Sequence, residues 1–186
     1  MSHRIYNLQR IQTWDETWCL RFNRASINPS LRKIFRLISR LGDGIFWYGL
    51  MLCLLAEHQA AALLPVLHMA AAGLVCTALY KWLKHKTHRP RPYNRNQGIH
   101  CGIAPLDQFS FPSGHTLHAV AFSIVALSYY PALAWLLLPF TALVALSRLV
   151  LGLHYPSDVL AGIAIGATIS GLSLGVSLPP YFASLF

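Results

Sequence analysis

Three short polar clusters contain most of the side chains in this sequence that could carry out chemistry. They are residues 84–92, residues 111–115, and a third set made of Ser147, Arg148, His154 and Asp158. Arginine and lysine bind phosphate oxygens through charge-assisted hydrogen bonds, and histidine can act as a nucleophile or move a proton near neutral pH. The combination predicts a site that binds a phosphate ester and cleaves it.

The histidines of the second and third clusters suggest a division of labour. Asp158 follows His154 by four residues, within one helical turn. Its carboxylate is therefore expected to hold one imidazole nitrogen as N–H and to leave the other free to attack phosphorus. His115 has no acidic neighbour in the sequence, and it is assigned to protonate the leaving oxygen.

Positive charge and a helix start complete the predicted phosphate site. Lys84, Arg91 and Arg148 are expected to neutralise the oxygens of the transferred phosphoryl group. Ser113 and Gly114 stand where a helix would begin, so backbone N–H groups and the helix dipole would add to the binding. With three cations available, the sequence predicts neither a metal ion nor a cofactor.

Several other polar residues have both a structural and a functional interpretation. His85 and His88 are three residues apart, but no cysteine or carboxylate lies near them in the sequence to complete a metal site. Arg89 also precedes a proline, yet Trp82 occupies the position where its partner lysine would stand, so Arg89 is interpreted as a helper or as a solvated side chain. His118 either lines the pocket or is a structural histidine.

The elements that must position these clusters are strongly apolar. Hydrophobic residues make up 55% of the 186 residues and charged residues 11%, against about a quarter charged in an average soluble domain. Apolar stretches cover about 44–56, 60–80, 117–130, 132–146 and 159–178. Some are shorter than the ~20 residues that cross a bilayer, and the first can be lengthened backwards to Leu31 at helical spacing. The predicted fold is all-α: a polytopic membrane bundle of about five transmembrane helices.

The amino-terminal part differs from the rest. Residues 5–27 mix Ile, Leu, Trp and Phe with Arg, so they are predicted to form an amphipathic helix on the membrane surface. The opening residues lack the apolar core of a secretory signal peptide. We expect one membrane-embedded domain over 1–186, with the amphipathic segment in 1–30 and the catalytic motifs in 84–158.

Alternating span directions would bring the three clusters to one end of the bundle. The joins near 57–59 and 130–131 would lie at the other end, and every Lys and Arg would share the end with the clusters. The rule that positive loops stay cytoplasmic explains this asymmetry, and phosphate binding explains it too. A net charge of +9 can indicate nucleic-acid binding, but here the charge lies at membrane joins, which excludes that class.

Taken together, the clusters resemble the three-part signature of the type 2 phosphatidic acid phosphatase family. The matching motifs are Lys84-x6-Arg91-Pro92, Pro112-Ser113-Gly114-His115 and Ser147-Arg148-x5-His154-x3-Asp158. The resemblance implies a helical bundle, a phosphohistidine on His154, orientation of that residue by Asp158, and His115 as the acid. The residues implied to hold phosphate are Lys84, Arg91, Ser113, Gly114 and Arg148.

The resulting hypothesis is metal-independent dephosphorylation of a membrane lipid phosphate or diphosphate. Candidate substrates are undecaprenyl diphosphate, phosphatidylglycerophosphate, phosphatidic acid and lipid A. Two alternatives stay open: a lipid-to-lipid phosphotransferase with the same site, and a non-catalytic lipid-binding or transport protein. Expected partners are the lipid substrate and the bilayer. The resemblance implies the bacterial cytoplasmic (inner) membrane, with the active site on the periplasmic face.

Overall fold

The chain folds into helices. The computed structural model describes the backbone of residues 2–177 and the side chains of residues 9–176. Within that part there is no strand, and Pro90 and Phe109 form an isolated backbone bridge. The long helices are α1 (Ser2–Asn23), α2 (Pro29–Arg40), α3 (Phe46–His58), α4 (Leu63–Thr87), α6 (Gly114–Tyr129), α7 (Ala134–Val150) and α8 (Pro156–Ser177). The short elements are η1 (Arg24–Ile27), η2 (Leu41–Ile45), η3 (Gln59–Ala62), α5 (Pro92–Arg95) and η4 (Pro131–Leu133).

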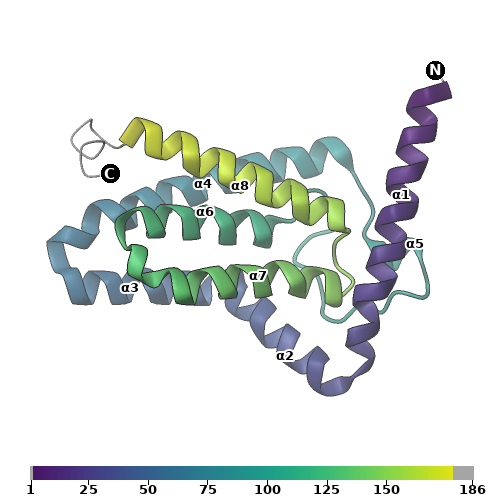
Figure 1. The fold of residues 1–186 in the computed structure, drawn as a ribbon, viewed down its shortest axis with the longest axis horizontal. Helices are drawn as coiled ribbons and strands as arrows, with labels where there is room; N and C mark the ends of the chain where they lie inside the picture. The colour runs from purple at the N-terminus through teal and green to yellow at the C-terminus, as the bar shows by residue number, and fades with distance from the viewer. Residues whose placement is uncertain (1, 178–186) are drawn as a thin grey trace.

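Five of these helices form a bundle, and α1 crosses one end of it (Figure 1). Helix α6 lies in the middle, where it contacts α4, α7 and α8. The largest apolar core joins α3, α4, α6 and α7 around side chains such as Trp47, Met69, Leu137 and Val144. The predicted all-α membrane bundle is therefore confirmed.

The five apolar stretches expected from the sequence coincide with α3, α4, α6, α7 and α8. Three helical stretches of the described chain are long and apolar enough to cross a membrane: Pro29–Thr87, Pro131–Val150 and Pro156–Val176. The first holds both α3 and α4, which meet at the turn η3. Helix α6 has 16 residues, so it is short for a bilayer span, and it lies inside the bundle.

A break separates α2 from α3, so the backward extension of the first span is helical but not straight. The π turn η2 contains Gly44, whose φ of 133° is available to glycine and is strained for other residues. A Cβ added at Gly42 would lie 3.1 Å from the side chain of Val144. The path of the chain therefore requires glycine at position 44 and leaves little room for a side chain at position 42, and between the two stands Asp43.

Helices α6 and α8 approach each other very closely. A Cβ added at Gly162 would lie 2.8 Å from the carbonyl oxygen of Ser113, and one added at Gly166 would lie 2.5 Å from that of Leu117. Small residues allow two helix backbones to touch, which is a common mode of packing in membranes. This contact places the second turn of α8 beside the start of α6, and the carbonyl oxygen of Asp158, in the first turn of α8, accepts from the N–H of Ser113 at 3.1 Å.

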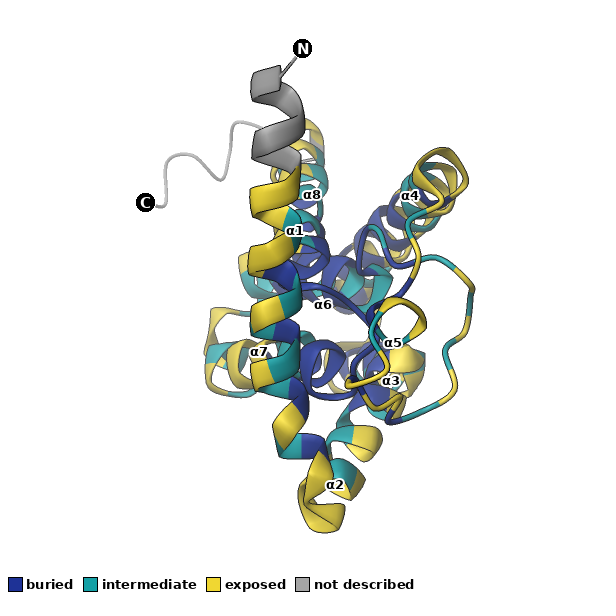
Figure 2. Cartoon of the chain, turned by 90° about the vertical axis from the view of Figure 1, so that its right-hand side faces the viewer, coloured by how far each residue is buried: buried dark blue, intermediate teal, exposed yellow. Residues whose placement is uncertain are grey.

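The amino-terminal helix is present as predicted, but its environment differs from the prediction. Asp15, Cys19 and Asn23 recur at four-residue spacing and are buried against the end of the bundle, while Ile11 and Trp14 are exposed (Figure 2). The buried stripe is polar because it bonds to other parts of the protein. One face of this helix therefore packs against the protein, which the sequence did not indicate, and its position on the membrane surface stays a prediction.

The two ends of the bundle differ in charge, as the alternation of spans predicts. At one end the rings of His58 and Tyr130 stack with centroids 4.9 Å apart, so the η3 and η4 joins meet there. The loops after α4 and α7, which carry the polar clusters, lie at the opposite end beside α1 (Figure 1).

Candidate active site

The three clusters meet at one cavity of about 920 Å³ at the basic end of the bundle. Helix α4 supplies Lys84, the following loop Arg91, helix α6 His115, helix α7 Arg148, and the loop before α8 His154. These five predicted residues all line the cavity, although they come from five separate segments. Convergence at a single site is therefore what the structure shows.

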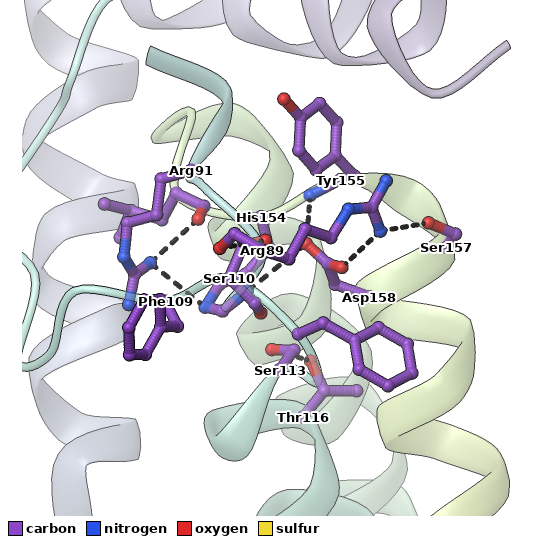
Figure 3. Close-up of polar contacts among 12 residues, drawn as sticks. Arg89, Arg91, Phe109, Ser110, Ser113, Thr116, His154, Tyr155, Ser157 and Asp158 are labelled. Atoms are coloured by element: carbon purple, nitrogen blue, oxygen red, sulfur yellow. Dashed lines mark hydrogen bonds and ion pairs between the residues drawn. The ribbon is translucent and has the colours of Figure 1, made fainter. Parts of the chain in front are cut away.

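His154 is held in one orientation by the loop that precedes α6. Its Nδ1 lies 2.6 Å from the carbonyl oxygen of Ser110. A carbonyl can only accept, so Nδ1 carries the proton and Nε2 keeps its lone pair. Nε2 lies 3.3 Å from Nη1 of Arg91 (Figure 3). Burial and the positive charges of Arg91 and Arg148 hold the pKa of His154 well below its ordinary value of 6.5. The free nitrogen is thus neutral and faces the cations.

The contact of Asp158 differs from the sequence expectation. Its Oδ2 lies 3.7 Å from Nδ1 of His154, beyond hydrogen-bonding distance, and the Ser110 carbonyl takes that proton instead. Asp158 is fully buried; its Oδ2 accepts from the backbone N–H of Tyr155 at 2.8 Å and its Oδ1 pairs with Arg89 at 2.6 Å. The carboxylate is close enough to stabilise positive charge on His154 without orienting it directly.

Two of the predicted cations share a carboxylate that sequence reasoning missed. Nζ of Lys84 lies 2.7 Å from both oxygens of Asp107, and Nη2 of Arg91 lies 2.9 Å from one of them. Burial alone would raise the pKa of Asp107, but the hydrogen bond and charge of Lys84 and the charge of Arg91 hold it below its ordinary value. Arg91 also donates to the carbonyl oxygen of Leu153 at 2.8 Å, which fixes its guanidinium.

Arg148, the third predicted cation, is buried at the end of α7. Its Nη1 hydrogen-bonds Oγ of Ser39 in α2. Its Nε has no hydrogen-bond partner within the described part of the protein. A buried guanidinium N–H without a partner is costly, and an anion in the cavity would satisfy it.

His115 also has a carboxylate partner that is distant in sequence. Its Nε2 hydrogen-bonds Oδ1 of Asp43, from the π turn between α2 and α3. His115 therefore has no acidic neighbour in the sequence, as expected, but it does have one in the folded protein. π turns inside helices often occur at functional sites.

Ser113 and Gly114 begin helix α6, as predicted. Ser113 is the residue that precedes the first turn, and its Oγ hydrogen-bonds Thr116 at 3.0 Å rather than facing the cavity. Gly114 lines the cavity together with His115. The first N–H groups of a helix have no partner in the helix, so this end can bind an anion.

Histidines with open interpretations also have places in the structure. His118 lines the cavity and hydrogen-bonds the carbonyl oxygen of Gly114 at 2.8 Å and Oγ1 of Thr77 at 3.0 Å, so it is both a pocket residue and a satisfied structural one. His85 lines the cavity too, whereas His88 stacks edge-on with Phe109. Among residues 9–176, whose side chains the structure describes, no group of three or more His, Cys, Asp and Glu is placed to hold a metal ion.

Comparison with known proteins agrees with this geometry. A family model described as the PAP2 superfamily matches residues 61–178, a range that contains all three clusters. The chain belongs to the PAP2 superfamily. The resemblance noted in the motifs is thereby confirmed.

Individual PAP2 proteins are similar over part or most of their length. A decaprenylphosphoryl-5-phosphoribose phosphatase of Mycobacterium tuberculosis is 34% identical over 104 residues, 55% of each chain. Undecaprenyl-diphosphatase BcrC of Bacillus subtilis is 36% identical over 101 residues, 54% of this chain and 50% of that protein. The chain thus spans about half the length of these curated relatives. A crystal structure of a transmembrane PAP2-type phosphatidylglycerolphosphate phosphatase from Bacillus subtilis superposes with a TM-score of 0.63 and 26% identity, covering 90% of this chain and 86% of that one.

Proposed function

We propose that this protein is a metal-independent phosphatase of membrane lipid phosphates that works through a phosphohistidine on His154. The observation that carries the proposal is the state of this side chain. Its Nδ1 proton is fixed on the Ser110 carbonyl, and its Nε2 lone pair faces Arg91 inside the cavity. A neutral, oriented imidazole beside three cations can attack a bound phosphorus atom.

In the first step, Nε2 of His154 forms a bond to phosphorus while the bond from phosphorus to the lipid oxygen breaks. His115 acts as the acid: the Asp43 carboxylate on its Nε2 favours the protonated imidazole, which gives its proton to that oxygen, and the dephosphorylated lipid leaves. Lys84, Arg91 and Arg148 neutralise the phosphoryl oxygens. The nearby carboxylate of Asp158 offsets the positive charge that the imidazole acquires, at 3.7 Å from Nδ1.

In the second step, a water molecule attacks the phosphorus of the phosphohistidine. His115, now neutral, accepts a proton from that water, and the phosphorus–nitrogen bond breaks so that its electron pair returns to Nε2. Inorganic phosphate leaves, and both histidines regain their starting states. One residue can serve first as acid and then as base because the second step is the chemical reverse of the first, with water in place of the lipid oxygen.

The wall of the cavity supports a lipid as the substrate. Away from the cations it is lined by apolar side chains of α3, α4 and α6, among them Trp47, Met51, Leu74 and Phe122. Decaprenyl and undecaprenyl carriers are named as substrates of similar proteins. We therefore place polyprenyl phosphates and diphosphates first, with phosphatidylglycerophosphate second.

We also propose that the catalytic end faces the outer side of the bacterial cytoplasmic membrane. The charge rule favours the opposite orientation. However, several basic residues at this end are engaged inside the protein: Arg36 with the Gly102 carbonyl, Lys84 and Arg91 with Asp107, and Arg148 with Ser39. Lys84, Arg91 and Arg148 belong to the proposed site and Arg36 holds a loop, so these charges carry little weight as a topology signal.

The test is phosphate release by the purified protein in detergent with a chelator present. Undecaprenyl diphosphate, phosphatidylglycerophosphate, phosphatidic acid and lipid A are compared side by side. We expect release from at least one of them, and a loss on the order of 10³-fold or more in His154→Ala. His58→Ala, at the far end of the bundle, is the matched control and should retain activity.

Four results would contradict the proposal. Activity that disappears with the chelator would exclude the metal-free mechanism. Activity that survives in His154→Ala would exclude the phosphohistidine. Phosphate found on an acceptor lipid instead of in solution would identify a phosphotransferase, and no release from any substrate would favour a non-catalytic lipid-binding protein.

A further inference from the structure

Helix α1 reaches the catalytic residues through Asp15. This carboxylate is fully buried, and its Oδ2 pairs with Nη2 of Arg89 at 2.6 Å. Its Oδ1 accepts from the backbone N–H of Ser157 at 2.9 Å, and the Ser157 hydroxyl donates to Oδ2 at 2.5 Å. Asp15 therefore caps the first turn of α8 from another helix and holds a guanidinium at the same time.

Arg89 connects Asp15 to Asp158, the carboxylate beside His154. Its Nη1 lies 2.6 Å from Oδ1 of Asp158 and 2.8 Å from Oγ of Ser157. Its guanidinium lies over the ring of Tyr155, 4.3 Å from the centroid (Figure 3). The side chain is thus fixed by two carboxylates, a hydroxyl and an aromatic face, which is incompatible with a merely solvated arginine.

The position of Asp158 depends on this arrangement. One of its oxygens is taken by Arg89 and the other by the Tyr155 N–H, so the carboxylate stays 3.7 Å from His154. Without Arg89, a fully buried carboxylate would lose its counter-ion and would have to rotate or take up a proton. Either change would alter the charge beside the nucleophile.

The rest of the buried stripe of α1 holds the same region. Nδ2 of Asn23 donates to the carbonyl oxygens of Val150 and His100, at 2.9 Å each, and Oδ1 of Asn23 accepts from the N–H of His100 at 2.8 Å. Sγ of Cys19 lies 3.9 Å from the carbonyl oxygen of His154 itself. Contacts to the end of α7, the following loop and the start of α8 therefore run along three turns of α1.

We propose that Asp15 and Arg89 are positioning residues that act on His154 through Asp158, so that α1 is part of the catalytic assembly. This inference rests on the proposed phosphatase function. Asp15 and the rest of α1 lie outside residues 61–178, the range that the family model matches. Neither residue lines the cavity, whereas the cations Lys81, Lys84, Arg91 and Arg148 do.

The main experiment replaces Asp15→Asn and measures kcat, KM and the unfolding temperature of the full chain. Asparagine keeps an oxygen that can accept from the Ser157 N–H, so the cap survives while the charge facing Arg89 is lost. We expect kcat to fall about tenfold, as is typical for loss of an outer-shell partner, with KM changed less than about twofold. Glu16→Gln is the matched control, because it removes the same charge one residue along, where the contact is with Gln12 of the same helix.

A double-mutant cycle shows whether Asp15 acts through Arg89. Arg89→Gln and the double variant are assayed well below their unfolding transitions. If the route is Asp15 to Arg89 to Asp158, the double variant should have the kcat of Arg89→Gln alone. Losses that multiply, or a kcat for Asp15→Asn equal to that of Glu16→Gln, would overturn the inference while leaving the phosphatase function standing. Absence of phosphate release by the wild type would overturn both.

Discussion

At the scale of single residues, a carboxylate of the protein already binds two of the cations of the proposed phosphate site. Asp107 contacts Lys84 and Arg91 together, and its side chain is 38% exposed at the mouth of the cavity. A substrate phosphate carries the same charge and the same kind of oxygens, so it competes with Asp107 for these cations.

Asp107→Asn should therefore bind phosphate analogues more tightly. We expect the inhibition constant for orthovanadate to fall about fivefold. This corresponds to about 1 kcal/mol, because vanadate no longer has to displace one charge-assisted contact of Asp107. The inhibition constant is measured from the inhibition of phosphate release. Glu57→Gln, an exposed carboxylate at the far end, controls for net charge. Weaker vanadate binding by Asp107→Asn would show that Asp107 holds the cations in place instead of competing for them.

The neutral state of His154 should also be visible in stability. Its pKa in the folded protein lies well below 6.5. Below pH 6.5 the unfolded chain therefore binds a proton here that the folded chain does not, and stability falls as the pH falls, by up to about 1.4 kcal/mol per pH unit. Above pH 6.5 this histidine makes stability neither rise nor fall with pH.

The measurement compares unfolding temperatures of wild type and His154→Gln from pH 7.5 down to about pH 4.5. The variant should lose less stability on acidification than the wild type. His58→Gln is the matched control. Parallel curves for wild type and His154→Gln would contradict a buried neutral imidazole.

At the scale of elements, the break between α2 and α3 allows Asp43 to reach His115. Gly44 at φ 133° and the closely packed Gly42 allow the π turn to place Asp43 on His115. A straight helix through this segment would not need a glycine with a positive φ. The acid of the proposed mechanism thus depends on the backbone of a different helix.

Gly44→Ala tests the turn. A Cβ at this position would lie 2.8 Å from the ring of Tyr48, on a backbone conformation that alanine rarely adopts. We expect a stability loss of about 1–3 kcal/mol and a lower kcat, read from unfolding temperature and phosphate release. Gly49→Ala is the matched control: no atom lies within 4 Å of its added Cβ, and it is inside α3, so it should be neutral or slightly stabilising. Equal effects of the two substitutions would contradict this role of the turn.

The sequence predicted the helices and the motif residues well, and the reason is local. Apolar runs show where helices must be, and each cluster lies at the end of one. The roles of three carboxylates could not be predicted because their partners lie far away in the sequence: Asp43 lies 72 residues from His115, Asp15 lies 74 from Arg89, and Asp107 lies 23 from Lys84. The periodicity of apolar residues carries no information about such contacts. The carbonyl of Ser110, a backbone atom, carries no sequence signal either.

At the scale of the whole molecule, orientation in the membrane follows from the asymmetry of the bundle. Cys101 is exposed in the loop at the catalytic end, while Cys19 and Cys76 are buried. A membrane-impermeant maleimide applied to intact cells should label Cys101 if this end faces outward. Cys101→Ser should abolish the label and so exclude Cys53, the other exposed thiol. Labelling that requires permeabilised cells would place the catalytic end in the cytoplasm.

The shortness of α6 has a consequence for how deep the reaction takes place. Its 16 residues extend about 24 Å, whereas the hydrocarbon layer is about 30 Å thick. With the aromatic ring of Tyr130 at the far interface, the helix ends about 6 Å short of the opposite headgroups. We therefore expect the proposed reaction to take place below the level of the headgroups, with the lipid entering sideways from its own leaflet. Water is the reactant that must travel, descending through the mouth of the cavity to reach phosphorus.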